Sequence, residues 1–156
     1  MSFWIVTDAC CDLPVDYIKK QMDLYVVPMS YQIEGKVQEI QLTDEALAGR
    51  VQDFYNRLED GAVATTFQVT QNEWEAHITP LLEQGNDVLL LVFSSALSGM
   101  YLTAKAAEEN LKAKFPGRKM FAFDTRCASL GEGMLVHYAL QYRDAGHGFQ
   151  ETLQWV

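Results

Sequence analysis

The chain contains no long hydrophobic run and no cluster of basic residues. Its most continuous apolar segment, 88–93, has the length of a buried strand and falls well short of the ~20 residues that cross a bilayer. Lys and Arg number 12 against 21 Asp and Glu, which gives a formal net charge of −9. Nucleic-acid and anionic-membrane surfaces need patches of positive charge. The sequence therefore argues against a nucleic-acid partner and against stable membrane insertion.

Cysteine is scarce, and its spacing does not suggest disulfide bonds. Cys10 and Cys11 are adjacent and Cys127 stands alone, which is an odd count without paired spacing. The N-terminal residues carry neither a basic segment nor a long apolar one, so they do not form a signal peptide. A reducing compartment is the simpler interpretation, and we expect a cytoplasmic protein.

Signatures of common catalytic, phosphate-binding and metal sites are also missing. The chain has no Gly-x-Ser-x-Gly elbow, no Gly-x-x-x-x-Gly-Lys loop and no Gly-x-Gly-x-x-Gly loop. None of its histidines, His77, His137 and His147, is clearly placed to serve as the base for a serine nucleophile. The adjacent cysteines lack ligand spacing, and Asp8 with Asp12 lacks a third ligand. These absences argue against a metal, a cofactor and catalysis by this chain alone.

What the sequence does contain is an alternation of short apolar segments and longer amphipathic ones. Strands are expected at 3–7, 24–28, 87–93 and 119–124, with a shorter extension over 29–36 that turns at Glu34-Gly35. Helices are expected to begin near 12–14 and to cover 43–59, 70–84, 98–114, 129–144 and 149–156. Thr43 is the expected cap of the second helix, and Thr70 and Glu73 form a capping box. The alternation predicts an α/β fold, a Rossmann-like three-layer domain with a mainly parallel sheet.

Hydroxyl side chains collect at the predicted carboxyl ends of the strands, where open parallel sheets bind their ligands. The richest segment is Ser94-Ser95-Ala-Leu-Ser98-Gly99, which leads into a helix N-terminus and could hold a carboxylate or phosphate. Ser and Thr are also ordinary helix caps, so a single loop of this kind is more often structural. Several at one sheet edge favour a ligand site. The other polar residues expected there include Thr7, Asp8, Thr66, Asp124, Thr125 and Ser129.

Four motifs, in order along the chain, resemble those of one known family. Thr7-Asp-Ala-Cys-Cys-Asp-Leu-Pro14 is similar to its Thr-Asp-Ser-x-x-Asp-Leu-Pro, and Thr66-Phe-Gln-Val-Thr70 lies where it has Thr-Ser-Gln-Pro-Ser. Ser94-Ser-Ala-Leu-Ser-Gly-Met-Tyr101 is similar to Ser-Ser-x-Leu-Ser-Gly-Thr-Tyr. Asp124-Thr-Arg-Cys-Ala-Ser-Leu-Gly-Glu-Gly133 is similar to Asp-Ser-x-x-x-Ser-x-Gly-x-Gly. Together the motifs resemble the DegV family over essentially the whole chain.

The resemblance implies the N-terminal half of a two-domain fold that holds one long-chain fatty acid in a tunnel. It implies that Thr66 and Ser95 meet the carboxylate, with Ser94 and Ser98 close by. It also implies an acyl-carrying subunit of fatty acid kinase, which needs no cofactor and presents the carboxylate to a separate catalytic subunit. On this basis, 1–147 form the N-terminal α/β domain, and 148–156 begin a helix leading to a second domain that is absent from this chain.

The sequence departs from the family pattern near the expected carboxylate site. Phe67 stands at a family Ser and Val69 at a Pro, while Ala9 and Met100 replace a Ser and a Thr. We expect Phe67 to add bulk beside the carboxylate. It would then narrow the mouth of the tunnel, change the preferred acyl length or abolish lipid binding.

Two other interpretations stay open. In the first, the chain is a phosphoryl- or acyl-transfer enzyme assisted by Asp8 or Asp124. In the second, it is a dimerisation domain without a ligand. The second rests on the final helix, which ends in Trp155 and Val156 and is marginal unless it docks on a partner or back on this domain.

Overall fold

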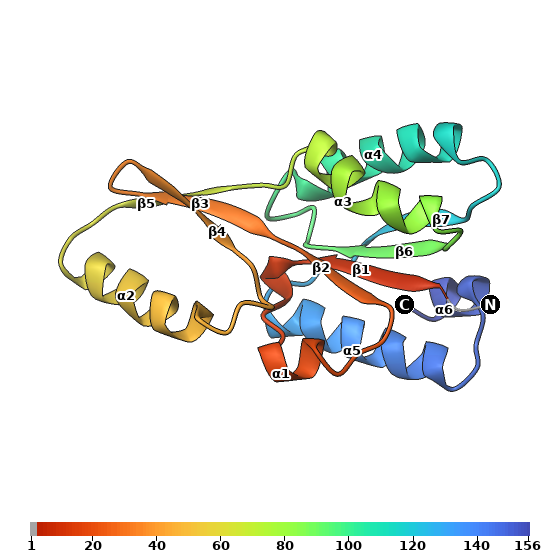
Figure 1. Ribbon diagram of the computed structural model, residues 1–156, viewed down its shortest axis with the longest axis horizontal. Helices are drawn as coiled ribbons and strands as arrows, with labels where there is room; N and C mark the ends of the chain where they lie inside the picture. The colour runs from red at the N-terminus through yellow and green to blue at the C-terminus, as the bar shows by residue number, and fades with distance from the viewer. Residues whose placement is uncertain (1–2) are drawn as a thin grey trace.

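The computed structural model describes residues 3–156 and consists of an α/β body with an arm projecting from it (Figure 1). The body holds a parallel sheet in the order β2-β1-β6-β7, built from β1 (Trp4–Asp8), β2 (Leu24–Val27), β6 (Val88–Val92) and β7 (Met120–Asp124). All five side chains of β6 are buried, because helices cover both faces of the sheet. The predicted parallel α/β sheet is therefore confirmed.

Helices form the two outer layers of the body. α3 (Gln71–Glu83) and α4 (Met100–Lys114) lie side by side on one face, while α1 (Val15–Ile18) and α5 (Leu130–Asp144) lie on the other (Figure 1). A 3₁₀ turn, η1 (Ala9–Cys11), follows β1 and contacts α5. This arrangement brings the segments that follow β1, β6 and β7 to one edge of the sheet.

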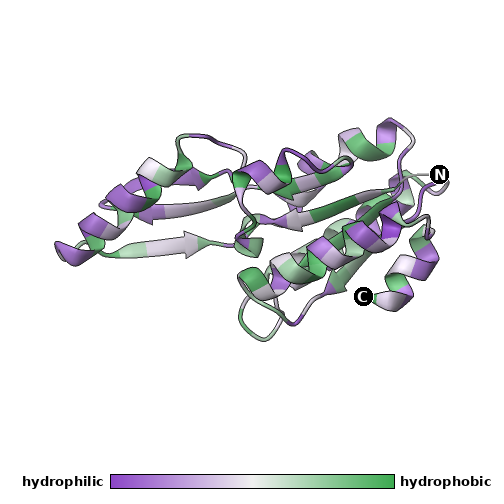
Figure 2. Ribbon diagram, turned by 90° about the horizontal axis from the view of Figure 1, so that it is seen from below, coloured by the Kyte–Doolittle hydropathy of each residue, from purple (hydrophilic) through white to green (hydrophobic). Residues whose placement is uncertain are grey.

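The arm is a small antiparallel sheet with one helix against it. Its strand order is β4-β3-β5, from β3 (Met29–Ile33), β4 (Lys36–Ile40) and β5 (Ala64–Phe67), and α2 (Leu47–Glu59) covers one face. Tyr31 of β3 meets Phe54 of α2 with ring centroids 5.0 Å apart. Figure 2 shows more hydrophilic colour along α2 than along the central strands of the body. The arm therefore buries far less apolar surface than the body.

Two expectations for the arm were wrong. β5 was not predicted as a strand, although it pairs with β3 over four residues. The helix predicted from Thr43 begins at Leu47, with Ala46 at the N-cap position and no side-chain cap. The Asp44 carboxylate accepts the N–H of Ala46 at 2.8 Å, which makes an Asx-type turn and delays the helix.

Other boundaries agree with the sequence. The Thr70 and Glu73 side chains form the reciprocal capping box at the start of α3, and Gly85, with φ +88°, follows its end. The turn between β3 and β4 has positive φ at both Glu34 and Gly35, as a tight hairpin turn requires. Local side-chain and backbone chemistry therefore sets these boundaries.

The last helix, α6 (Phe149–Trp155), docks on the body. Phe149 meets Phe3 edge to face with ring centroids 5.4 Å apart. Trp155 stacks on Tyr142 of α5 at 5.2 Å and remains 45% exposed. Among residues 3–156, no helix is both long and apolar enough to cross a membrane.

Candidate functional site

The loop from Ser94 to Gly99 follows β6 and forms the centre of the candidate site. Ser94 is buried, and its N–H donates to the Cys127 carbonyl at 3.0 Å. Its hydroxyl oxygen accepts the N–H of Ala96, and that of Ser98 accepts the N–H of Met100, both at 3.2 Å. Ser94 and Ser98 therefore shape the loop, whereas Ser95 is exposed at its surface.

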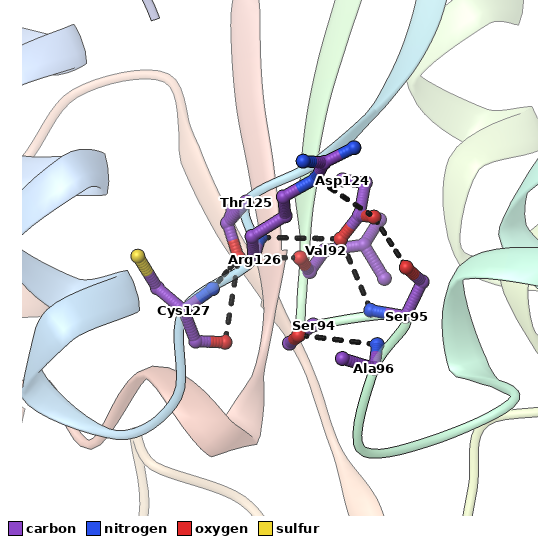
Figure 3. A network of polar contacts seen from close by, with 8 residues as sticks. All are labelled: Val92, Ser94, Ser95, Ala96, Asp124, Thr125, Arg126 and Cys127. Carbon is purple, nitrogen blue, oxygen red and sulfur yellow. Dashed lines mark hydrogen bonds and ion pairs between the residues drawn. The ribbon is translucent and has the colours of Figure 1, made fainter.

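Ser95 is held by Asp124, the last residue of β7 (Figure 3). The Ser95 hydroxyl donates to Asp124 Oδ2 at 2.5 Å, and the Ser95 N–H donates to Oδ1 at 3.0 Å. The N–H of Arg126 also donates to Oδ1, at 3.1 Å. Partial burial raises the pKa of Asp124, but the hydrogen bonds from Ser95 and Arg126 outweigh it and leave the pKa below its usual value. Asp124 is therefore an anion that fixes both the loop and the Ser95 hydroxyl.

Asp8, at the end of β1, holds the start of the same loop from inside the protein. Its carboxylate accepts the N–H of Phe93 at 3.0 Å and the N–H of Cys10 at 3.0 Å. Behind it lies Glu132 of α5, which accepts the hydroxyl proton of Thr7 at 2.8 Å. Asp8 and Glu132 are both fully buried. Asp8 therefore supports the site and has no open path to a substrate.

Thr66 lies on the arm, close along the chain to a residue that contacts the serine loop. It is exposed on β5, two residues before Gln68, whose side chain lies directly against Gly99. A Cβ atom at position 99 would be 2.7 Å from Gln68 Oε1, so the end of the Gln68 side chain lies close against this glycine. An extended chain rises about 3.3 Å per residue, which places Thr66 roughly 7 Å along the strand from Gln68. Gln68 therefore links the segment that follows Thr66 to the serine loop.

Phe67 lies on the opposite face of β5 from Thr66. Successive side chains of a strand point to opposite faces, so Phe67 faces away from Thr66. Phe67 instead lines an open cavity of 350 Å³ with Val37, Val69 and other residues of the arm and α3. Its bulk is therefore on the opposite side of β5 from the hydroxyl of Thr66.

The cysteines and histidines are engaged elsewhere. Burial raises the pKa of the Cys11 thiol to about 12 and that of Cys10 further still, which keeps both thiols protonated. His77 and His137 form hydrogen bonds with tyrosine hydroxyls at 2.8 and 2.7 Å, and His147 stacks on Tyr142. Within residues 3–156, no group of three or more His, Cys, Asp or Glu side chains is arranged to hold a metal.

Comparison with known proteins finds a matching family and several similar relatives. Over residues 2–156 the chain matches a family described as "Uncharacterised protein, DegV family". It is 35% identical over 155 residues to a DegV domain-containing protein of Clostridium perfringens and 32% identical over 154 residues to one of Lactococcus lactis. Each alignment covers 99% of this chain and 52% of the relative, so the chain spans about half the length of these relatives.

Solved structures show the same architecture. A DegV family protein of Thermus thermophilus, described as binding fatty acid, matches with a TM-score of 0.81 and 28% identity over 99% of this chain and 51% of that one. A Thermotoga maritima protein, described as having a fatty acid binding function, matches with a TM-score of 0.82 and 25% identity. That match covers 99% of this chain and 53% of the other. A stearic-acid-binding protein of Eubacterium ventriosum matches with a TM-score of 0.85 over 98% of this chain and 51% of that one. Its sequence identity is 20%, so this match supports the fold alone. The four ordered motifs, the fold and the match along the whole chain agree, and the chain belongs to the DegV family.

Proposed function

We propose that this chain binds a long-chain fatty acid and holds its carboxyl group at the hydroxyls of Thr66 and Ser95. Ser94 and Ser98 shape the loop that presents Ser95. The observation that carries the proposal is the contact of Gln68, two residues after Thr66, with Gly99 of the serine loop, in a family with fatty-acid-binding relatives. We further propose that the protein acts in the cytoplasm as a carrier, without catalytic activity or a cofactor of its own, and presents the carboxyl group to a separate kinase subunit.

The chemistry of the site favours holding a ligand over transforming it. Burial of an acyl chain contributes about 0.8 kcal/mol per methylene, so the tail supplies most of the affinity. The carboxyl group then needs orientation, which neutral hydroxyls provide. Asp8 is buried and accepts two backbone N–H groups, which leaves it unsuited to act on a ligand.

The first test is native mass spectrometry of the purified protein followed by lipid extraction. We expect about one fatty acid per chain. The longer relative from Clostridium perfringens, of which this chain covers 52%, is measured in parallel, because we propose that the other half of the relatives' length closes the tunnel. Absence of lipid from both proteins, before and after incubation with oleic acid, would contradict the proposal.

Replacing Thr66 or Ser95 with Ala is expected to raise the Kd for oleic acid about tenfold, the cost of one hydrogen bond to a carboxyl group. Thr65→Ala is the matched control, since Thr65 is also exposed on β5 but faces the other side. Fluorescent fatty-acid displacement measures the three Kd values. Unchanged Kd values for both site variants would contradict the proposal that Thr66 and Ser95 hold the carboxyl group.

Acyl transfer remains the second candidate because Asp124 contacts the Ser95 hydroxyl, the arrangement of a nucleophile beside a base. The lowered pKa of Asp124 makes its carboxylate a weak base and disfavours this activity. Hydrolysis of a p-nitrophenyl acyl ester by the wild-type chain, with loss of that hydrolysis in Ser95→Ala, would support the enzyme instead of the carrier.

A further inference from the structure

We propose that Asp124 is a specificity-determining positioning residue: by taking the only proton of the Ser95 hydroxyl, it makes that hydroxyl a hydrogen-bond acceptor. The site then selects a protonated carboxyl group over a carboxylate. This inference rests on the proposed function, because it concerns the form in which the fatty acid is held.

The direction of the Ser95 hydrogen bond follows from the charge of Asp124. An ionised carboxylate only accepts hydrogen bonds, so the contact of 2.5 Å between Ser95 Oγ and Asp124 Oδ2 must use the hydroxyl proton. Two backbone N–H groups, from Ser95 and Arg126, donate to the other oxygen and keep Asp124 in place (Figure 3). The carboxylate therefore holds the serine backbone and its hydroxyl as one unit.

The lone pairs are all that Ser95 Oγ then offers to a ligand. A carboxylate has no proton to donate to them, and its charge would lie near that of Asp124. A protonated carboxyl group donates its own O–H to Ser95 Oγ and accepts a hydrogen bond through its carbonyl oxygen. In the proposed site, the Thr66 hydroxyl is the donor for that carbonyl. No covalent step or proton transfer to the protein is involved.

The surrounding charges do not reverse this preference. Among residues 3–156, Arg126 is the one cation within 4.0 Å of the Asp124 carboxylate, with Nε 4.0 Å from Oδ2, and its side chain is 87% exposed and well solvated. The ionisable groups near the loop include Asp8 and Asp12 after β1, Glu132 on α5, Tyr101 on α4, and Asp124, Arg126 and Cys127 after β7. The β5–α3 segment contributes the neutral Gln68 and the capped Glu73. Acidic groups therefore outnumber the single exposed cation.

The test compares three ligands that share one tail: oleic acid, oleyl alcohol and methyl oleate, each below its aggregation concentration. Above the carboxyl pKa, the Kd of oleic acid is expected to rise about tenfold per pH unit, because binding takes up one proton. Oleyl alcohol, a neutral donor, is expected to bind independently of pH between 5 and 9. Methyl oleate cannot donate and is expected to bind about tenfold more weakly than the alcohol.

Variants separate Asp124 from its neighbours. Asp124→Asn frees Ser95 to donate to a carboxylate, so the pH slope is expected to disappear and the Kd at pH 8 to fall about tenfold. Arg126→Gln is the matched control and is expected to change the Kd less than about twofold, as for an exposed charge. If Asp124→Asn does not fold, Ser95→Ala provides the second readout, because it must abolish the preference for the alcohol over the ester.

The outcomes distinguish this inference from the proposed function. Oleic acid that binds with the same Kd from pH 6 to pH 9 would overturn the role of Asp124 and leave fatty-acid binding intact. A strong loss of oleate binding in Arg126→Gln would overturn it as well, because the carboxylate would then pair with Arg126. Failure of all three ligands to bind at any pH would refute the proposed function itself and this inference with it.

Discussion

Glu132→Gln is expected to stabilise the folded protein at pH 8 by on the order of 3 kcal/mol and to flatten its stability between pH 5 and pH 9. Glu132 and Asp8 are fully buried and interact electrostatically, so one of the two carboxyl groups must carry a proton. Burial and the charge of Asp8 raise the pKa of Glu132 to about 9. Burial raises the pKa of Asp8 as well. Gln keeps the size of Glu132, still accepts the proton of Thr7, and donates to Asp8 without ionising.

The sign of the effect follows from proton binding. Below the ordinary carboxyl pKa near 4.5, Glu132 is protonated in both the folded and the unfolded chain. As the pH rises from about 4.5 to about 9, the unfolded chain loses this proton while the folded protein keeps it. The folded state binds more protons throughout this window, so its stability falls as the pH rises. Gln has no such proton to lose and removes the slope.

Urea unfolding of wild type and Glu132→Gln at pH 5, 7 and 9 measures how the free energy of unfolding of each protein changes with pH. Glu109→Gln on the exposed side of α4 is the matched control, with an expected change within about 0.5 kcal/mol. Parallel pH profiles for wild type and Glu132→Gln would show that the buried pair has no linked proton. Fatty-acid binding by the same samples shows whether the buried pair affects the candidate site, because Asp8 accepts the N–H of Phe93 just before the serine loop.

The sequence predicted the body because each of its elements is decided locally. The all-apolar β6 and the capping box of α3 each give a pattern that needs no distant partner. The serine loop was found for the same reason, since it directly follows such a strand. Membership of the family was also accessible, because its motifs lie in these connections.

The arm and the buried polar contacts depend on partners far along the chain. β5 is Ala-Thr-Thr-Phe, a segment without strand periodicity whose conformation comes from pairing with β3. The face on which Phe67 lies depends on β5 being a strand, and the sequence did not indicate that strand. The burial of Glu132 does not follow from its neighbours in the sequence, because it depends on the packing of α5 against β1 and η1.

Gly133→Ala is expected to destabilise the fold by about 3 kcal/mol, because α5 lies too close to η1 for any side chain at this position. The added Cβ would lie 2.4 Å from the backbone oxygen of Cys11 and 3.1 Å from Leu13 Cδ2. A backbone oxygen cannot rotate away, so α5 or η1 must shift. Such a shift also moves Glu132 relative to Asp8, and we expect weaker fatty-acid binding along with the loss of stability.

Gly131→Ala in the first turn of the same helix is the decisive control. There the added Cβ would be 3.6 Å from Cys127 Cβ, an ordinary contact, and position 131 is exposed. Ala is the better helix former by about 1 kcal/mol, so this variant is expected to be as stable as wild type or more stable. The two substitutions have the same chemistry and lie two residues apart. Opposite changes in the urea midpoint would therefore assign the effect to the η1 contact, whereas equal changes would mean that the contact with η1 imposes no penalty on a side chain at position 133.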